Sequence, residues 1–263
     1  MSAQASHTQR PPHAAARLKL ADYRGPAAFG DEWEGWLRYA WHFMTSHIKL
    51  ADLVRLCPAT RDYLYGRHTP RRVTYTAGQR PILERLLDEL AMVHPGLTSR
   101  RPDRPALAAF LADWVYWEVY RRGEVLRRGQ WTQQIIEGGV EEQTVALIGR
   151  TGSFECSRLL ATLLQMRRIP ARLVLLFGRP FQARAGVEAY LDGAWRFFDV
   201  KANVQYSTRD GQLAGLWEVA THPYCTRRGV QGRANPEVDV TDRSAFGQLG
   251  VVNYPVKPEI RRW

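Results

Sequence analysis

Residues 186–200 read GVEAYL, DG and AWRFFDV, and this stretch decides the fold of the second half of the chain. Asp192-Gly193 stands between two strand-like runs, which is a strong signal for a β-hairpin with a two-residue turn. Such a turn places residue 186 opposite residue 199, and residue 188 opposite residue 197. The sequence therefore predicts the register of two antiparallel strands as well as their existence.

The predicted hairpin brings charged side chains together. Strand side chains alternate between the two faces of a sheet, so Arg184 points to the same side as Asp199. The two residues would be diagonal neighbours, within reach of long side chains. Glu188 shares that face and offers Arg184 a second carboxylate. The sequence leaves open which of the two acids binds Arg184.

A cysteine precedes the hairpin at the start of a predicted helix. Ser153 can cap a helix that runs through Arg168, and Pro170 ends it. Residues 171–177 then read as a mostly buried strand. Cys156 falls in the first helical turn, where unpaired N–H groups and the helix dipole stabilise a thiolate. The thiolate is the nucleophilic form, so Cys156 is a candidate nucleophile.

The first half of the chain carries helical patterns. Residues 1–25 are rich in Ala, Arg, Pro and His and are predicted to form a flexible tail. Apolar residues recur at three- and four-residue spacing over 31–51, 81–93 and 105–128. The sequence predicts a helical N-terminal region over residues 26–130.

Residues 131–263 are predicted to form the core. In it, the helix that bears Cys156 packs on a small antiparallel sheet, which makes the protein α+β. Residues 205–263 are rich in Gly, Pro and polar residues. We expect one helix near 213–219 and otherwise an irregular extension or edge structure.

The composition narrows the classes of function. The 263 residues are 45% hydrophobic, and no apolar run approaches the ~18 residues needed to span a membrane. Residues 1–20 lack the apolar region of a secretory signal, so a cytoplasmic location is expected. The three cysteines are widely spaced and predict neither a disulfide framework nor a metal site. Nothing in the sequence indicates a cofactor.

The net charge is +11, and arginine doublets spread along the chain supply much of it. Charge spread in this way is typical of a solvated surface, and it also suits an acidic partner or an anionic substrate carrier. No helix-turn-helix, zinc-finger or RNA-binding aromatic motif accompanies the charge. Nucleic acid is therefore not the expected partner.

Residues 137–200, about a quarter of the chain, resemble the transglutaminase-like superfamily, whose fold is related to that of papain-like proteases. The residues that carry the resemblance are Gly152-x-x-x-Cys156, Ile169-Pro170-Ala171-Arg172, Val187-Glu188, Tyr190-Leu191-Asp192-Gly193-x-Trp195 and Asp199. Position 184 lies 28 residues after Cys156 and 15 before Asp199, and both intervals suit the family.

The resemblance implies a Cys-His-Asp triad that forms a thioester with an acyl donor and passes the acyl group to an amine or to water. Carried over to this chain, the nucleophile is Cys156 and the orienting carboxylate is Asp199. The histidine position falls on Arg184, and the frequent tryptophan after it falls on Gly186. The resemblance predicts a cysteine acyltransferase that forms or hydrolyses amides or esters. Its donor would be a peptide, a thioester or a carrier-bound acyl group.

Three residues upstream of Cys156 are further candidates. In the superfamily an upstream Trp or Gln can contribute to the oxyanion hole, and Trp131, Gln133 and Gln134 stand in that region. A core tryptophan and surface glutamines are the plainer interpretation of the same residues.

Arg184 limits the chemistry, because arginine stays protonated and is no general base. Four interpretations remain open. A catalytically inactive pseudoenzyme would bind a peptide or protein partner through the former cleft. An Arg184–Asp199 pair would favour the Cys156 thiolate for attack on an activated donor such as a thioester. His222, the only histidine after Cys156, would supply another base. Other chemistry would use the pocket without the thiol.

Overall fold

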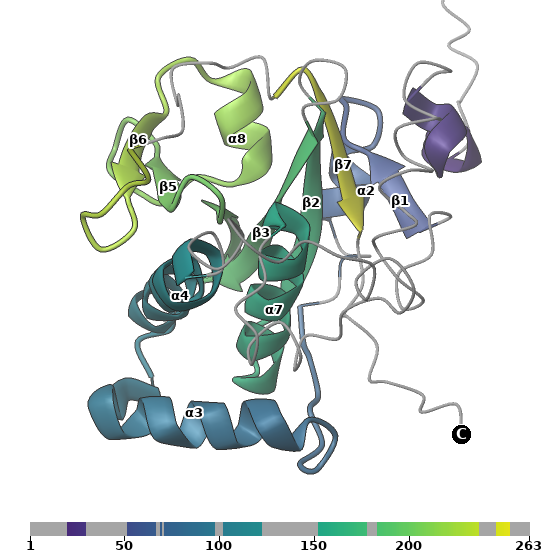
Figure 1. Ribbon diagram of the computed structural model, residues 1–263. Coiled ribbons are helices and arrows are strands. Elements are labelled where there is room, and N and C mark those ends of the chain that lie inside the picture. Colours follow the sequence, from purple (N-terminus) through teal and green to yellow (C-terminus); the bar gives the residue numbers. More distant parts are fainter. Residues whose placement is uncertain are drawn as a thin grey trace, which may run out of the picture.

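The structure is a computed structural model of the 263-residue chain, and it describes residues 20–29, 52–66, 69, 71–97, 102–122, 152–177, 183–236 and 246–252. These residues form an α+β protein in which helices pack against a seven-stranded antiparallel sheet (Figure 1). The helix predicted over 31–51 and the candidates Trp131, Gln133 and Gln134 lie outside the described residues.

The sheet has the strand order β1-β7-β2-β3-β4-β5-β6. Its strands are β1 (Leu53–Arg55), β2 (Ala171–Phe177), β3 (Ala183–Leu191), β4 (Ala194–Asp199), β5 (Val204–Ser207), β6 (Thr226–Gly229) and β7 (Gln248–Val252). Strands β2 to β6 follow one another along the chain. Strand β7 instead lies between β1 and β2 and pairs with both. The C-terminal region, expected to be irregular or edge structure, thus contributes an interior strand.

The hairpin forms as predicted. In the β3–β4 ladder Val187 lies opposite Phe198 and Glu188 lies opposite Phe197. Asp192 and Gly193 have φ values of 47° and 83°, the left-handed backbone that a type I′ turn requires. The register prediction is therefore confirmed, and local turn chemistry explains it.

The helices come mainly from the first half of the chain. The described helical segments are two 3₁₀ turns at Leu20–Tyr23 and Pro26–Phe29, α2 (Arg61–Tyr65), α3 (Pro81–Val93), a 3₁₀ turn at Pro95–Leu97, α4 (Arg104–Trp114), a π-helical segment at Val115–Arg121, α7 (Ser153–Met166) and α8 (Leu216–Thr221). The helix predicted over 105–128 begins at Arg104 and becomes π-helical at Val115. Part of the predicted tail is held in place, since the Gly25 N–H donates to the Leu53 carbonyl at 2.9 Å.

Two apolar clusters cover the two faces of the sheet. The α7-side cluster joins α3, α4 and α7 to inward residues of β2 and β3, such as Leu173 and Val187. The α8-side cluster joins α2 and α8 to residues of the opposite face, such as Leu176 and Phe197. Figure 1 shows α7 lying against β2 and β3, with α3 crossing below α4 and α7. Both faces of the central strands are therefore buried.

Candidate functional site

Cys156 is the fourth residue of α7 and lies in a closed environment. The N-cap is Gly152, so the predicted Ser153 cap is wrong. The Ser153 hydroxyl instead accepts the Ala185 N–H at 3.2 Å and ties α7 to β3. The Cys156 side chain is 0% exposed and belongs to the α7-side cluster. Its N–H donates to the Gly152 carbonyl at 3.1 Å, so this amide is already engaged within the helix.

Arg184 and Asp199 form an ion pair at the ends of β3 and β4. Nη2 of Arg184 lies 3.2 Å from Oδ2 of Asp199, and the two side chains are 11% and 0% exposed. The other carboxylate oxygen of Asp199 accepts the Ala202 N–H at 3.2 Å. The guanidinium of Arg184 also stands 5.8 Å from the centre of the Phe246 ring. Arg184 thus pairs with the carboxylate that the resemblance expected to orient a histidine.

The ion pair and the cysteine belong to opposite faces of the sheet. The residues of β3 that join the α7-side cluster with Cys156 alternate along the strand and are Ala185, Val187 and Ala189. The residues between them therefore point to the other face. There Arg184 meets Phe246, which packs against the α8-side cluster.

Aromatic rings fill the space beside Gly186, the position at which the resemblance places a tryptophan. A Cβ atom on Gly186 would lie 2.6 Å from the Phe197 ring and 2.7 Å from the Phe198 carbonyl oxygen. The Phe197 ring stacks on Tyr206 at 5.9 Å, and the Phe246 ring stands edge-on to Tyr206 at 5.9 Å. Only glycine fits at 186 without displacing this group of rings.

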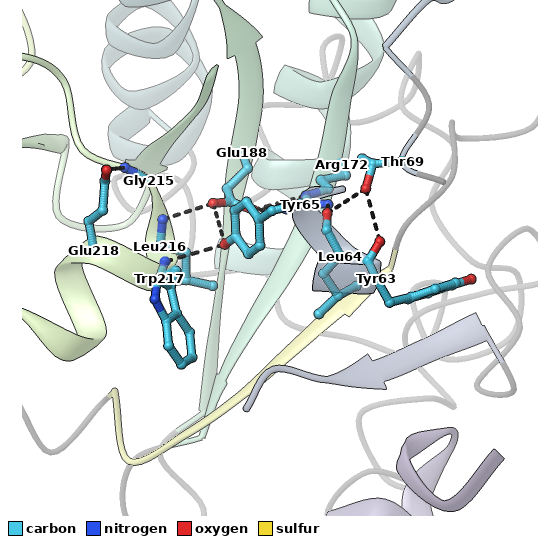
Figure 2. Close-up of polar contacts among 10 residues, drawn as sticks. All are labelled: Tyr63, Leu64, Tyr65, Thr69, Arg172, Glu188, Gly215, Leu216, Trp217 and Glu218. Carbon is cyan, nitrogen blue, oxygen red and sulfur yellow. Dashed lines mark hydrogen bonds and ion pairs between the residues drawn. The ribbon is translucent and has the colours of Figure 1, made fainter. Parts of the chain in front are cut away.

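Glu188 binds Arg172 rather than Arg184, which answers the question that the sequence left open. Oε2 of Glu188 accepts hydrogen bonds from Nε and Nη2 of Arg172 at 2.9 Å and 2.7 Å (Figure 2). Oε1 accepts the Tyr65 hydroxyl at 2.9 Å and the Leu216 N–H at 2.8 Å. Both charged side chains are buried, with exposed fractions of 1% and 0%. One carboxylate therefore links α2, β2, β3 and α8.

The cation of this buried network is also fully partnered. Arg172 donates to the Leu64 carbonyl, and its guanidinium lies 4.1 Å from the centre of the Trp195 ring and 4.7 Å from that of Tyr65. Burial, and next to it the negative charge of Glu188, raise the pKa of Tyr65 well above its usual value. The Tyr65 hydroxyl therefore stays protonated and keeps donating to the carboxylate.

Sequence reasoning missed this network, although one signal for it was present. Arg172 is the one charged residue in the otherwise apolar strand that contains it, and a buried charge requires a partner. Arg172 lies directly opposite Glu188 in the β2–β3 ladder. Tyr65 had no comparable signal, because only the tertiary structure brings α2 to this face.

His222 lies on the surface, at the C-terminal end of α8. Its Nδ1 is 2.9 Å from the Thr221 hydroxyl. It lines a hollow of about 320 Å³ together with Thr208, Arg209, Asp210, Glu218, Tyr224 and Cys225. The cysteine that shares this hollow is Cys225, so the geometry does not favour His222 as the base for Cys156.

The described part of the chain contains neither a cluster of metal-ligating side chains nor a helix that could span a membrane. Within it, no group of three or more His, Cys, Asp or Glu side chains is arranged to hold a metal ion. None of the described helices combines the length and the apolar character of a transmembrane span. Cys57, Cys156 and Cys225 form no disulfide.

The Arg184–Asp199 pair does not provide acid–base chemistry. An arginine beside Asp199 supplies a fixed positive charge and cannot shuttle a proton in the way a histidine does. Comparison of the chain with described protein families, with curated proteins and with solved structures finds no match. The functional argument therefore depends on the geometry and on the resemblance seen in the sequence.

Proposed function

We propose that this protein is a catalytically inactive, transglutaminase-like protein that binds a peptide or protein partner. The observation that carries the proposal is the Arg184–Asp199 ion pair at 3.2 Å, where the family would have a histidine. Position 184 therefore supplies no general base, and Asp199 already has a cationic partner. Exchange of a titratable histidine for a permanent cation removes the proton transfer on which acyl transfer to amines depends.

Burial reinforces the proposal. Asp199 is 0% exposed, so breaking its pair would leave an uncompensated buried charge, at a cost of about 3–5 kcal/mol. Cys156 is also 0% exposed, and an acyl donor would have to open the α7-side cluster to reach it. The ion pair and the Ser153–Ala185 hydrogen bond are suited to holding β3, β4 and α7 in one arrangement.

A cysteine acyltransferase that uses activated donors is the second candidate. It is favoured by the place of Cys156 in the first turn of α7, where the helix dipole stabilises a thiolate. In the reaction, the Cys156 sulfur would bond to the carbonyl carbon of a thioester while the donor's own carbon–sulfur bond breaks. The donor thiolate would leave without a proton, so no general acid would be needed.

Thiol reactivity tests the proposal. The native protein is incubated with iodoacetamide or with a small acyl thioester, and the modified cysteines are located by mass spectrometry after digestion. Cys57, which is partly exposed, serves as the internal reference. We expect Cys156 to react at least about a thousandfold more slowly, because an opening of about 4 kcal/mol corresponds to that factor.

An acyl adduct on Cys156 that forms at the rate of Cys57, and that is lost in Cys156→Ala, would overturn the proposal and support the acyltransferase. Arg184→His provides the matched variant. If it alone gains acyl transfer, the remainder of the site is competent and the arginine accounts for the inactivity of the wild type. If neither protein reacts, the inactivity of the site stands and its cause extends beyond residue 184.

A further inference from the structure

Strand β6 (Thr226–Gly229) is an open edge of the sheet. Among the described residues it is the last strand in the order and pairs with β5 alone. Its first three residues are exposed to solvent. Figure 1 shows β6 at the outer margin of the molecule, away from β7 and β1. A terminal strand of this kind can accept a further strand through its backbone.

The alternation of hydrogen-bonded and non-hydrogen-bonded pairs between β5 and β6 identifies which backbone groups of β6 point away from β5. Tyr206 of β5 lies opposite Arg227 of β6, and the Tyr206 carbonyl accepts the Ala214 N–H at 2.7 Å, on the side away from β6. Tyr206 and Arg227 therefore form a non-hydrogen-bonded pair. It follows that the N–H and C=O of Arg227 point to the open edge. Further along, the Gly229 carbonyl accepts the Gly232 N–H at 3.0 Å, which limits the open edge to its first part.

Charge indicates what this edge would bind. Arg227 and Arg228 are exposed and, as neighbours in a strand, point to opposite faces. No carboxylate among the described residues forms an ion pair with either. A partner strand beside β6 would thus have one arginine on each of its faces. Two consecutive acidic residues in that strand could form an ion pair with each arginine.

The surface beside the start of β6 adds an apolar contact. Tyr224 is 66% exposed, which is unusual for a large aromatic side chain, and it lines the hollow described above. The two carboxylates of that hollow are engaged: Glu218 accepts the Gly215 N–H at 2.7 Å, and Asp210 accepts the Thr208 hydroxyl. The arginines of β6 suit acidic side chains, and the exposed Tyr224 ring offers an apolar contact beside them.

We propose that β6 binds an acidic peptide in extended conformation, which adds to the sheet beside Arg227 and presents consecutive acidic residues to Arg227 and Arg228. This inference rests on the proposed binding function and names its surface and the class of partner. Backbone hydrogen bonds to Arg227 set the position of the peptide, and the two charge pairs select its sequence.

The test measures the fluorescence anisotropy of a labelled peptide, TVEDVT, with the full-length protein. In antiparallel addition, Glu of the peptide faces Arg228 and Asp faces Arg227, so of these two only Asp has its N–H directed at β6. Two further peptides carry an N-methyl group on Glu or on Asp. We expect the peptide methylated on Glu to bind like the parent and the peptide methylated on Asp to lose binding. Equal behaviour of the two would overturn strand addition.

The protein variants test the charge pairs. We expect Arg227→Glu with Arg228→Glu to weaken binding at least about tenfold, because both attractions become repulsions. Arg72→Glu with Arg104→Glu makes the same change in net charge at exposed sites elsewhere and should leave binding within about twofold. Circular dichroism and the urea midpoint verify that both variants fold. If the two double variants lose peptide affinity equally, net charge explains the loss and the proposed binding site on β6 is wrong.

Further outcomes separate this inference from the proposed function. If a twelve-residue oligothymidine binds more tightly than the peptide and depends on the same arginines, the surface recognises nucleic acid and the inference is wrong. If the peptide does not bind and Cys156 is inert, the inference fails while the inactive site stands. If Cys156 becomes acylated and the peptide still binds, the proposed inactivity is wrong and the inference about the β6 surface remains supported.

Discussion

Glu188→Gln tests whether the buried network around Glu188 stabilises the packing of α2 and α8 on strands β2 and β3. The substitution keeps the shape of the side chain but removes its charge, so Arg172 becomes a buried cation without a counter-ion. Breaking a buried pair in this way costs about 3–5 kcal/mol. Whichever way the new amide turns, its nitrogen would face donors that the carboxylate now accepts, either those of Arg172 or those of Tyr65 and Leu216. We therefore expect a loss near the upper end of that range.

Urea unfolding, followed by circular dichroism, measures the loss. For a slope of about 3 kcal/mol per molar urea, a loss of about 4 kcal/mol lowers the midpoint by about 1.3 M. Glu89→Gln is the matched control, because Glu89 pairs with Arg85 at 3.1 Å on the exposed face of α3. An exposed pair of this kind contributes about 0.5 kcal/mol or less.

A second variant separates the charge effect from loss of packing. Adding Arg172→Met to Glu188→Gln removes the uncompensated cation, so the double variant should lose less stability than the sum of the two single changes. If Glu188→Gln costs no more than Glu89→Gln, the network does not stabilise the fold in the way argued. Strict additivity of the two changes would contradict the ion-pair explanation in the same way.

Three further predictions concern single residues. The pKa of Tyr65 is raised in the folded state, so above about pH 10 the tyrosine of the unfolded chain ionises first and the free energy of unfolding should fall as the pH rises. Tyr65→Phe should make this fall with pH less steep in urea titrations from pH 9 to 11. An equally steep fall in the variant would contradict the prediction. Gly186→Ala should lower the free energy of unfolding by about 1–3 kcal/mol, because the new methyl group would clash with the Phe197 ring. An unchanged free energy of unfolding would show that the ring can move aside. Asp103→Ala should lower the free energy of unfolding by about 1 kcal/mol in thermal melting, because Asp103 is the N-cap of α4 and accepts the Ala106 N–H at 3.0 Å. Asp103→Asn keeps a side-chain oxygen that can accept this hydrogen bond, so it should retain most of the stability.

Local signals in the sequence predicted the hairpin and the pairing that follows from it. The Asp192-Gly193 turn sets the register of β3 and β4, and that register brings Arg184 to Asp199. The turn is a property of two adjacent residues, and side-chain alternation extends its consequences along both strands. The strand at 171–177 followed from an apolar run of suitable length.

Signals of the same kind misplaced the cap of α7. Ser153 has the residue type of an N-cap, yet Gly152 takes that place and the Ser153 hydroxyl receives the Ala185 N–H from β3. A long-range hydrogen bond thus overrides a local preference, and no local pattern could have indicated it.

The sequence by itself determined that a cysteine stands at a helix start and that an arginine occupies the position at which the resemblance to transglutaminase-like proteins places a histidine. Only the tertiary structure decided which acid each arginine binds: Glu188 binds Arg172, and Asp199 remains for Arg184. It also placed β7 inside the sheet and Cys156 on the face opposite the ion pair. These outcomes depend on contacts between segments far apart in the chain, which a periodicity of two or 3.6 residues does not encode.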